Sequence, residues 1–516
     1  MGYRTLVIDD CWSLPTRDPA SGKLRADPAA FPGGMRRVAD YLHGLNLTLG
    51  MYSDRGEKTC AGRPGSGGFE ELDAEYFARD VGVDLLKYDS CFATSDRGTA
   101  FAEYGRMRDA LNRTGRAVVF QACGWNAWYA PEGAALANTW RIAADADDWL
   151  HIYRGIRTNE ALGAFAGPGK GFNDPDMLVG SGQGTAVSIT PAQSRTQFNV
   201  WAAMASPLII GASLTDMTPW DLATYSNEKV IAVNQDPRGV QGRPVYSDCP
   251  GKPYVPLEQA SPTTFPMNIT PWTWSWALLR RCVLLSMALF GACALVFMYV
   301  VTRCVSPSSS SSSSCPSSSK RGPGGSAATL GFSVLEAHYA EEGAGSSSSL
   351  AAPFGVNGSG ESRAFSRRGD GVGPSVGRRW ACKCCAVFMG VASLAMFAVT
   401  VWFMVVLTWG VDPCSQVWAK PLAVGTTESI RGSSMNNTSN GVAMVFVNYD
   451  AAAKVVRCDA ACLAEAGFEQ GDLLDAEDLW GGDAPSKISS DGIECELKAS
   501  PGGGTSCMLL VTKRRR

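Results

Sequence analysis

Short apolar runs recur along the first 237 residues, and each ends in polar residues before an amphipathic stretch begins. The amphipathic stretches repeat apolar positions at helical spacing, as Met35, Val38 and Leu42 do. Strands that alternate with helices favour a parallel β-sheet. We therefore predict seven strands, at 5–8, 47–52, 83–88, 117–122, 142–144, in the stretch that reaches 177–179, and at 208–210.

Aspartates gather at the carboxyl ends of these runs. In a TIM (β/α)8 barrel the chemistry lies at the carboxyl ends of the parallel strands. An isolated aspartate there is more often a helix N-cap or a turn residue, but five groups on one rim indicate a candidate active site. We therefore predict a (β/α)8 barrel over 1–237, with seven of its eight strands in the sequence. The aspartates are Asp9, Asp10, Asp54, Asp89, Asp145, Asp174 and Asp176.

The pattern changes after this region. Residues 238–252 and 413–516 carry short β-type runs between clusters of Gly, Asn and Asp, which predicts a small antiparallel β domain. Its clearest runs are 442–447, 453–456 and 508–511. An insert at 253–412 separates the two parts of this domain.

The insert contains two uncharged stretches, 282–302 and 384–411, each long enough to cross a bilayer as a helix. The loop between them, 303–383, is rich in Ser and Gly and is predicted to be disordered. Its nine basic residues favour the cytoplasmic side, so that both flanks emerge together on the opposite side. The alternative is that the insert is untranslated sequence, such as a retained intron.

Composition narrows the function further. A net charge of −3 offers no basic face for nucleic acid. Seventeen cysteines, with sequons at Asn112, Asn436 and Asn437, favour an oxidising, secretory compartment. No signal peptide follows Met1, so we expect the true start to lie upstream. Only three histidines are present, in unrelated contexts, which leaves paired carboxylates as the reacting groups.

Six short motifs follow one another along the first half of the chain. They are Ile-Asp-Asp-Cys-Trp at 8–12, Lys-Thr-Cys-Ala-Gly at 58–62, Leu-Lys-Tyr-Asp-Ser-Cys at 86–91, Trp-Arg-Ile-Ala-Ala-Asp at 140–145, Asn-Asp-Pro-Asp-Met-Leu at 173–178 and Val-Asn-Gln-Asp-Pro at 233–237. In order and spacing they resemble those of the α-galactosidase (melibiase) family of glycoside hydrolases. The resemblance covers about 1–250 and resumes at 414–421, whereas the insert has no counterpart.

The resemblance implies a retaining exo-glycoside hydrolase that releases terminal α-linked galactose by double displacement, without a cofactor or a metal. It makes Asp89 the nucleophile and Asp145 the general acid/base. Lys87, two residues before Asp89, should favour the ionised carboxylate. Asp145 must instead carry a proton to assist the leaving group.

The resemblance also implies a set of substrate-binding residues. For Lys87 and Arg141 the alternative is a structural salt bridge on the rim. The set is Asp9 and Asp10 for the 4- and 6-hydroxyls, Lys87 for the 3- and 4-hydroxyls, Arg141 and Asp176 for the 2- and 3-hydroxyls, and Tyr52 and Met177 as pocket walls.

The resemblance also bears on the cysteines, and the sequence departs from the family pattern at several positions. It implies a disulfide between Cys60 and Cys91, and leaves Cys123 free or re-paired because Ala137 stands at the partner position. It implies that the family's opening strand, and with it a partner for Cys11, is missing. Gly124 follows Cys123 where galactose-selective members commonly carry Glu.

These departures keep several alternatives open. The same chemistry could cleave an α-N-acetylgalactosaminide or a β-L-arabinopyranoside, and an incomplete pocket would suit an inactive, membrane-tethered carbohydrate-binding protein or a fragment that does not fold. We expect an α-galactoside oligosaccharide or glycoconjugate as partner and leave a homodimer open. The expected compartment is the secretory pathway, the lysosome or vacuole, or the extracellular space, with a membrane anchor if the insert is translated.

Overall fold

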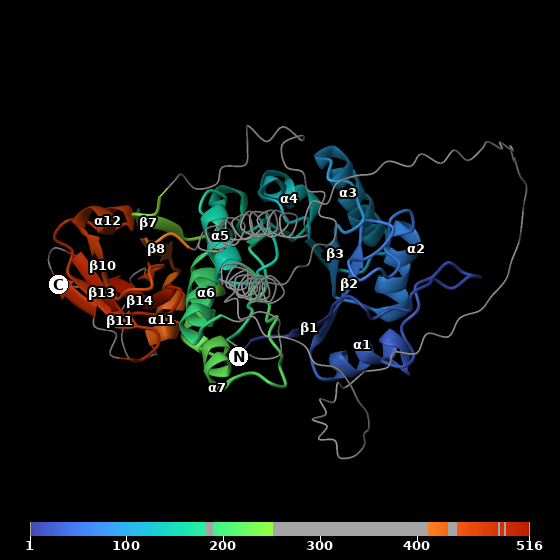
Figure 1. Ribbon diagram of the computed structural model, residues 1–516, viewed down its shortest axis with the longest axis horizontal. Helices are drawn as coiled ribbons and strands as arrows, with labels where there is room; N and C mark the ends of the chain where they lie inside the picture. Colours follow the sequence, from blue (N-terminus) through green and yellow to red (C-terminus); the bar gives the residue numbers. More distant parts are fainter. Residues whose placement is uncertain are drawn as a thin grey trace, which may run out of the picture. The chain divides into compact units, whose positions relative to one another are not determined.

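The structure is a computed structural model that describes residues 2–181, 189–250, 411–431, 441–482, 486–489 and 492–514. Figure 1 shows parallel strands and helices in the first half of the chain and an antiparallel β domain at its C-terminal end.

The first half of the chain forms a six-stranded parallel sheet in which the strands follow one another in chain order. A single parallel bridge between Leu178 and Ile210 lies beyond these six strands. The expectation of a parallel sheet followed by antiparallel β structure is confirmed. The strands are β1 (Thr5–Ile8), β2 (Thr48–Asp54), β3 (Leu85–Asp89), β4 (Val119–Ala122), β5 (Thr139–Arg141) and β6 (Phe172–Asp174).

Three predicted strands need correction. The run at 142–144 is not a strand, because β5 ends just before it at Arg141. The stretches 177–179 and 208–210 contribute only the isolated bridge, whereas β6 lies earlier, at Phe172–Asp174. A search for apolar runs misses β5 and β6 because both strands contain polar residues. Those polar residues are nevertheless buried.

Amphipathic helices cover the sheet, as the spacing of apolar positions predicts. In α1 the residues Met35, Ala39 and Leu42 are buried on one face. Helix α6 begins with a capping box in which Thr190 and Gln193 each bond the other's backbone N–H. The helices are α1 (Gly34–Gly44), α2 (Glu70–Glu75) with its π-helical continuation η1 (Tyr76–Val81), α3 (Arg97–Arg113), α4 (Ala130–Leu136), α5 (Trp149–Asn159), α6 (Pro191–Ala203), α7 (Pro219–Tyr225) and α8 (Glu228–Asn234), with short 3-10 turns η2 (Ala127–Tyr129) and η3 (Gly163–Phe165).

The C-terminal region contains a five-stranded and a three-stranded antiparallel sheet. Every residue of β9 is buried, because the larger sheet packs on both faces: Val445 lies in a core with Trp201 of α6, and Phe446 in a core with Ile493 of the smaller sheet. The elements are β7 (Arg243–Ser247), β8 (Ser415–Pro421), β9 (Gly441–Asn448), β10 (Lys454–Asp459), β11 (Leu474–Asp478), β12 (Ser486–Ser489), β13 (Gly492–Leu497), β14 (Thr505–Lys513), α11 (Val424–Arg431) and α12 (Ala460–Glu465).

The two flanks of the insert meet at one point of the β domain. Strand β7 pairs antiparallel with β8, and a disulfide joins Cys249 to Cys414 with their Cα atoms 4.8 Å apart. The predicted span 282–302 and loop 303–383 lie outside the described residues, as does the span 384–411 except for Val411. Within the described ranges no helix combines the length and apolarity that crossing a membrane requires.

Lys420 of β8 is fully buried, and its Nζ has no hydrogen-bond partner among the described residues. The nearby Asp236 accepts backbone N–H bonds from Arg238 and Ala423 instead. Burial lowers the pKa of Lys420 to about 8, and the negative charge of Asp236 only partly opposes this shift. Below that pH the folded protein therefore holds a desolvated, unpaired ammonium group.

We expect Lys420→Met to increase the free energy of unfolding at pH 7 by about 2 to 3 kcal/mol, because the methionine needs no solvation. The unfolded lysine keeps its ordinary pKa, so the penalty is complete below pH 8 and fades as the pH rises towards about 10. Urea unfolding at pH 7 and pH 10 measures both values, with the exposed Lys498→Met as control. A gain that does not shrink at pH 10 would contradict this account.

Candidate active site

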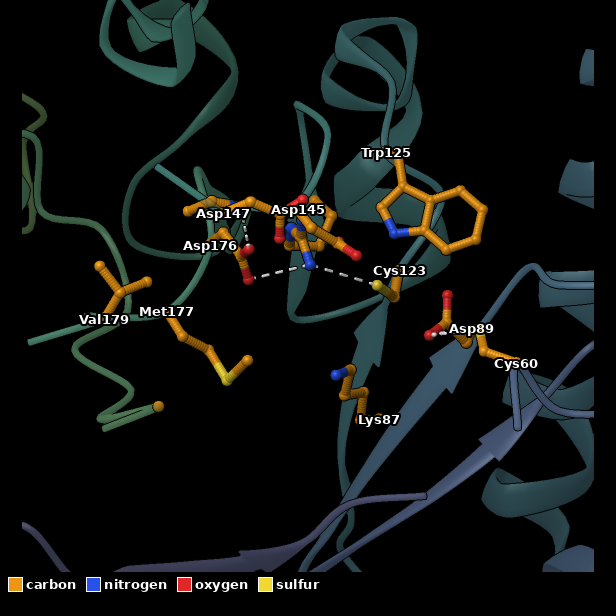
Figure 2. A pocket seen from close by; sticks show the side chains of 13 residues that line it. Cys60, Lys87, Asp89, Cys123, Trp125, Asp145, Asp147, Asp176, Met177 and Val179 are labelled. Carbon is orange, nitrogen blue, oxygen red and sulfur yellow. Dashed lines mark hydrogen bonds and ion pairs between the residues drawn. The ribbon is translucent and has the colours of Figure 1, made fainter. Parts of the chain in front are cut away.

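The carboxyl ends of β3 to β6 surround a cavity of about 230 Å³. Asp89 ends β3, Arg141 ends β5, and Asp176 follows β6 by two residues. Figure 2 shows the side chains of Asp89 and Asp176 around the same space, with Asp145, Lys87 and others. The lining residues are Cys60, Lys87, Asp89, Cys123, Trp125, Arg141, Asp145, Ala146, Asp147, Asp176, Met177, Val179 and Gly211.

Asp89 is 5% exposed and is held by two hydrogen bonds. The hydroxyl of Tyr52 donates to Asp89 Oδ2 at 2.9 Å, and the backbone N–H of Ser90 donates to Oδ1 at 2.9 Å. Burial raises the pKa of Asp89, and the positive charge of Lys87 opposes that rise. A carboxylate fixed in this way presents its remaining lone pairs to the cavity.

Lys87 connects the cavity to the end of β1. Its Nζ forms an ion pair with Asp9 Oδ2 at 2.8 Å and lies 5.3 Å from the ring centre of Tyr52. Asp10 faces the neighbouring loop, where its Oδ2 accepts the N–H of Ala61 at 2.8 Å. Asp9, Asp10 and Tyr52 therefore stand beside the residues that line the cavity rather than among them.

Asp54 is paired with Asp89 in the register of β2 and β3. Burial, followed by the charge of Asp89, raises the pKa of Asp54 to about 8. Its two carboxylate oxygens accept the backbone N–H groups of Gly56 and Cys91. Asp54 thus ties together the loops after β2 and β3, and a disulfide joins the same loops through Cys60 and Cys91, with 5.0 Å between their Cα atoms.

Arg141 is 4% exposed and bridges two carboxylates. Its guanidinium lies 2.8 Å from Asp145 Oδ1 and 2.9 Å from Asp176 Oδ1. The side chain of Asp145 is 62% exposed, so this carboxyl group faces the open mouth of the cavity. The arrangement gives one carboxyl group at the mouth and another, Asp89, on the floor.

Asp176 has a φ of +97°, a strained backbone conformation for a residue with a side chain. Three contacts hold it there: the ion pair with Arg141, the N–H of Ala146 bonded to Oδ2 at 2.7 Å, and the indole of Trp201 bonded to its carbonyl at 2.7 Å. Neighbouring Asp174 accepts the N–H of Asp176, and burial raises the pKa of Asp174 to about 6. Strain maintained by surrounding contacts is a common feature of binding sites.

The cavity also contains residues that the sequence patterns did not single out. Asp147, Ala146, Val179 and Gly211 line it. Gly211 directly follows the apolar run 208–210, so the rule that found the strand-end aspartates would also have found it. Among the described cysteines, Cys11 and Cys123 are free, and the buried Cys123 thiol lies 3.6 Å from Arg141 Nη1.

Comparison with known proteins agrees with this arrangement. A melibiase family model described as alpha galactosidase A matches residues 1–236. Alpha-galactosidase A of Homo sapiens is 44% identical over 253 residues, which is 47% of this chain and 57% of that protein. Alpha-galactosidase 3 of Arabidopsis thaliana is 43% identical over 254 residues, 48% of this chain and 55% of that protein. The chain thus spans a little over half the length of these relatives.

A solved structure extends the likeness to the fold. The alpha-galactosidase of Saccharomyces cerevisiae, solved with raffinose, has a TM-score of 0.55 and 20% identity, with 99% of this chain and 90% of that chain covered. At this identity the likeness concerns the fold alone. Residues 1–236 thus match the family model of the α-galactosidase (melibiase) family of glycoside hydrolases, and the curated relatives match over the same part of the chain.

Proposed function

We propose that the protein is a retaining exo-glycoside hydrolase that releases terminal α-linked galactose from oligosaccharides or glycoconjugates, with β1 to β6 as part of a (β/α)8 barrel. The observation that carries this proposal is that Asp89 and Asp145 line one cavity at the carboxyl ends of the strands. Two carboxyl groups, one buried and one at the mouth, suit double displacement. We expect their carboxyl groups to face each other across the mouth of the barrel, about 5 to 7 Å apart.

In this mechanism Asp89 attacks the anomeric carbon while Asp145 protonates the departing oxygen, which gives a galactosyl ester on Asp89. Asp145 then removes a proton from water, and the water opens the ester from the face that the leaving group vacated. Two inversions release α-galactose. Asp9 and Asp10 would bind the 4- and 6-hydroxyls, and Lys87 the 3- and 4-hydroxyls. Arg141 and Asp176 would bind the 2- and 3-hydroxyls, with Tyr52 and Met177 as pocket walls.

The 2-position of the sugar decides between the related activities. Gly124 stands where galactose-selective relatives commonly carry Glu, and the ring of Tyr129 fills the space beside it, since an added Cβ would lie 1.9 Å from Tyr129 Cε2. Trp125 follows with a φ of +53° and lines the cavity. A bulky indole leaves less room for a 2-acetamido group than for a hydroxyl, which favours an α-galactoside over an α-N-acetylgalactosaminide.

We therefore expect kcat/KM for p-nitrophenyl α-galactoside to exceed that for the N-acetyl-α-galactosaminide by at least about tenfold. Parallel initial-rate measurements on both substrates, and on p-nitrophenyl β-L-arabinopyranoside, test the preference. Trp125→Ala should narrow the gap, whereas the surface variant Asp109→Asn should leave it unchanged. A larger kcat/KM for the acetamido sugar would reverse the assignment, and sugar binding without turnover would favour the inactive carbohydrate-binding relative.

The compartment follows from the cysteines. Four disulfides among the described residues, including Cys458–Cys462 and Cys495–Cys507, fit an oxidising compartment such as the secretory pathway, a lysosome or vacuole, or the extracellular space. Attachment to a membrane through the insert and formation of a homodimer stay predictions.

A further inference from the structure

A second cavity, of about 390 Å³, lies away from the active site and shares no lining residue with it. It opens widely to solvent and is lined by residues between 24 and 36, which lead into α1, and by η1. Leu24, Met35 and Val81 form a buried apolar part of its wall. Ligand sites in proteins commonly have this size and a largely apolar lining with a few polar groups.

The aromatic side of the cavity is rigidly supported. Tyr76, which lines it, stacks on Trp12 with ring centres 5.9 Å apart and planes 11° from parallel. Trp12 is 4% exposed, and its indole N–H donates to the backbone carbonyl of Tyr52 at 2.9 Å. A flat apolar group entering the cavity would therefore meet a wall that is already in place.

The charged residues of the cavity differ in whether they have partners. Asp80 pairs with Lys23 at 2.6 Å, and Arg36 pairs with Asp40 at 2.8 Å. Arg25 forms no ion pair with any described residue.

The guanidinium of Arg25 is incompletely bonded. Nη2 makes contacts of 3.2 and 3.4 Å with Thr16, whereas Nε is buried without an acceptor. The charge of Arg25 helps to lower the pKa of Asp18, but the two form no ion pair. Instead, Asp18 Oδ1 accepts the backbone N–H groups of Ala20 and Ser21. Among the described residues the Nη2 edge makes only its long contacts with Thr16, and a carboxylate is the acceptor that fits a guanidinium edge best.

We infer that this cavity is a second binding site, for a small carboxylate with a flat apolar body whose oxygens bond Arg25 while the apolar part packs against Tyr76 and Leu24. The site is independent of the galactoside site, and its occupation does not depend on the protein's being a hydrolase. Neutral apolar compounds should bind weakly because they bring no carboxylate for Arg25. Free sugars should also bind weakly because their hydroxyl groups pack poorly against the apolar wall.

Calorimetric titration of the full chain with 2-naphthoate tests the inference. We expect one site per chain, binding at least about tenfold tighter than the uncharged isostere 2-naphthamide. Arg25→Met should weaken naphthoate by about tenfold or more, whereas Arg36→Met, which removes the same charge from the same cavity, should change it less than about twofold. Saturating galactose should leave the affinity unchanged.

Three results would overturn the inference: no heat of binding, equal affinity for acid and amide, or displacement of naphthoate by galactose. The comparison of acid with amide uses the unaltered protein, so it holds even if Arg25→Met fails to fold. Loss of α-galactosidase activity in some other variant does not affect any of these outcomes, which separates this test from that of the proposed function.

Discussion

Replacing Asp89 by asparagine is expected to lower kcat/KM for an aryl α-galactoside by at least about 1000-fold. Asparagine has the same shape and can still accept the hydrogen bond from Ser90 or Tyr52, so the cavity should survive. What it lacks is the anionic oxygen that must form the bond to the anomeric carbon. Because the loss concerns the chemical step, it should appear in kcat as well as in kcat/KM.

The environment of Asp89 adds a pH dependence to this result. Burial raises the pKa of Asp89, and the nucleophile must be ionised to react, so activity should fall on the acid side as the carboxylate takes up a proton. The acid limb of the kcat/KM profile should therefore lie above the ordinary range of an aspartate. Removing the opposing charge with Lys87→Met should move that limb to still higher pH.

Controls separate chemistry from folding. Asp109→Asn, on the surface of α3, should retain the activity of the unaltered protein, and thermal unfolding should show that Asp89→Asn is folded. A folded Asp89→Asn protein that keeps more than about a tenth of the activity cannot have lost its nucleophile.

The sequence predicted those strands whose buried residues are mostly apolar. Runs at 5–8, 47–52, 83–88 and 117–122 fall on β1 to β4, within a few residues at each end. β5 escaped because Arg141 is buried there, which is tolerable only because Asp145 and Asp176 neutralise it. Asp145 lies only four residues further along the chain, whereas Asp176 lies beyond β6, and a local pattern cannot reveal that second partner.

The site was predictable in part for a related reason. Strand ends identify which aspartates share the rim, but not what each carboxylate touches. Asp54 and Asp89 look alike in the sequence, yet Asp54 bonds two backbone N–H groups of loops while Asp89 faces the cavity. The pairing of Lys87 with Asp9 joins residues 78 positions apart, so only the folded chain brings it about.

Under the proposed mechanism, Asp145→Gly should slow galactoside hydrolysis to an extent that depends on the leaving group. An alkyl galactoside such as raffinose needs protonation of its departing oxygen, so we expect a loss of about 10² to 10⁴ in kcat/KM. The 2,4-dinitrophenolate of a 2,4-dinitrophenyl galactoside departs without protonation, so kcat/KM for this substrate should change less than about tenfold. Because Asp145 is exposed at the cavity mouth, the glycine variant should leave the core intact.

Azide distinguishes the two carboxylates by stereochemistry. In Asp145→Gly the ester on Asp89 still forms, and azide, which needs no general base, replaces water to give α-galactosyl azide. In Asp89→Gly no ester forms, so azide attacks the substrate directly and gives the β-anomer. Proton NMR of the products distinguishes the two anomers by the coupling constant between the protons on C1 and C2. The opposite outcome, a β-azide from Asp145→Gly, would exchange the two roles, because it would mean that removing Asp145 had removed the nucleophile.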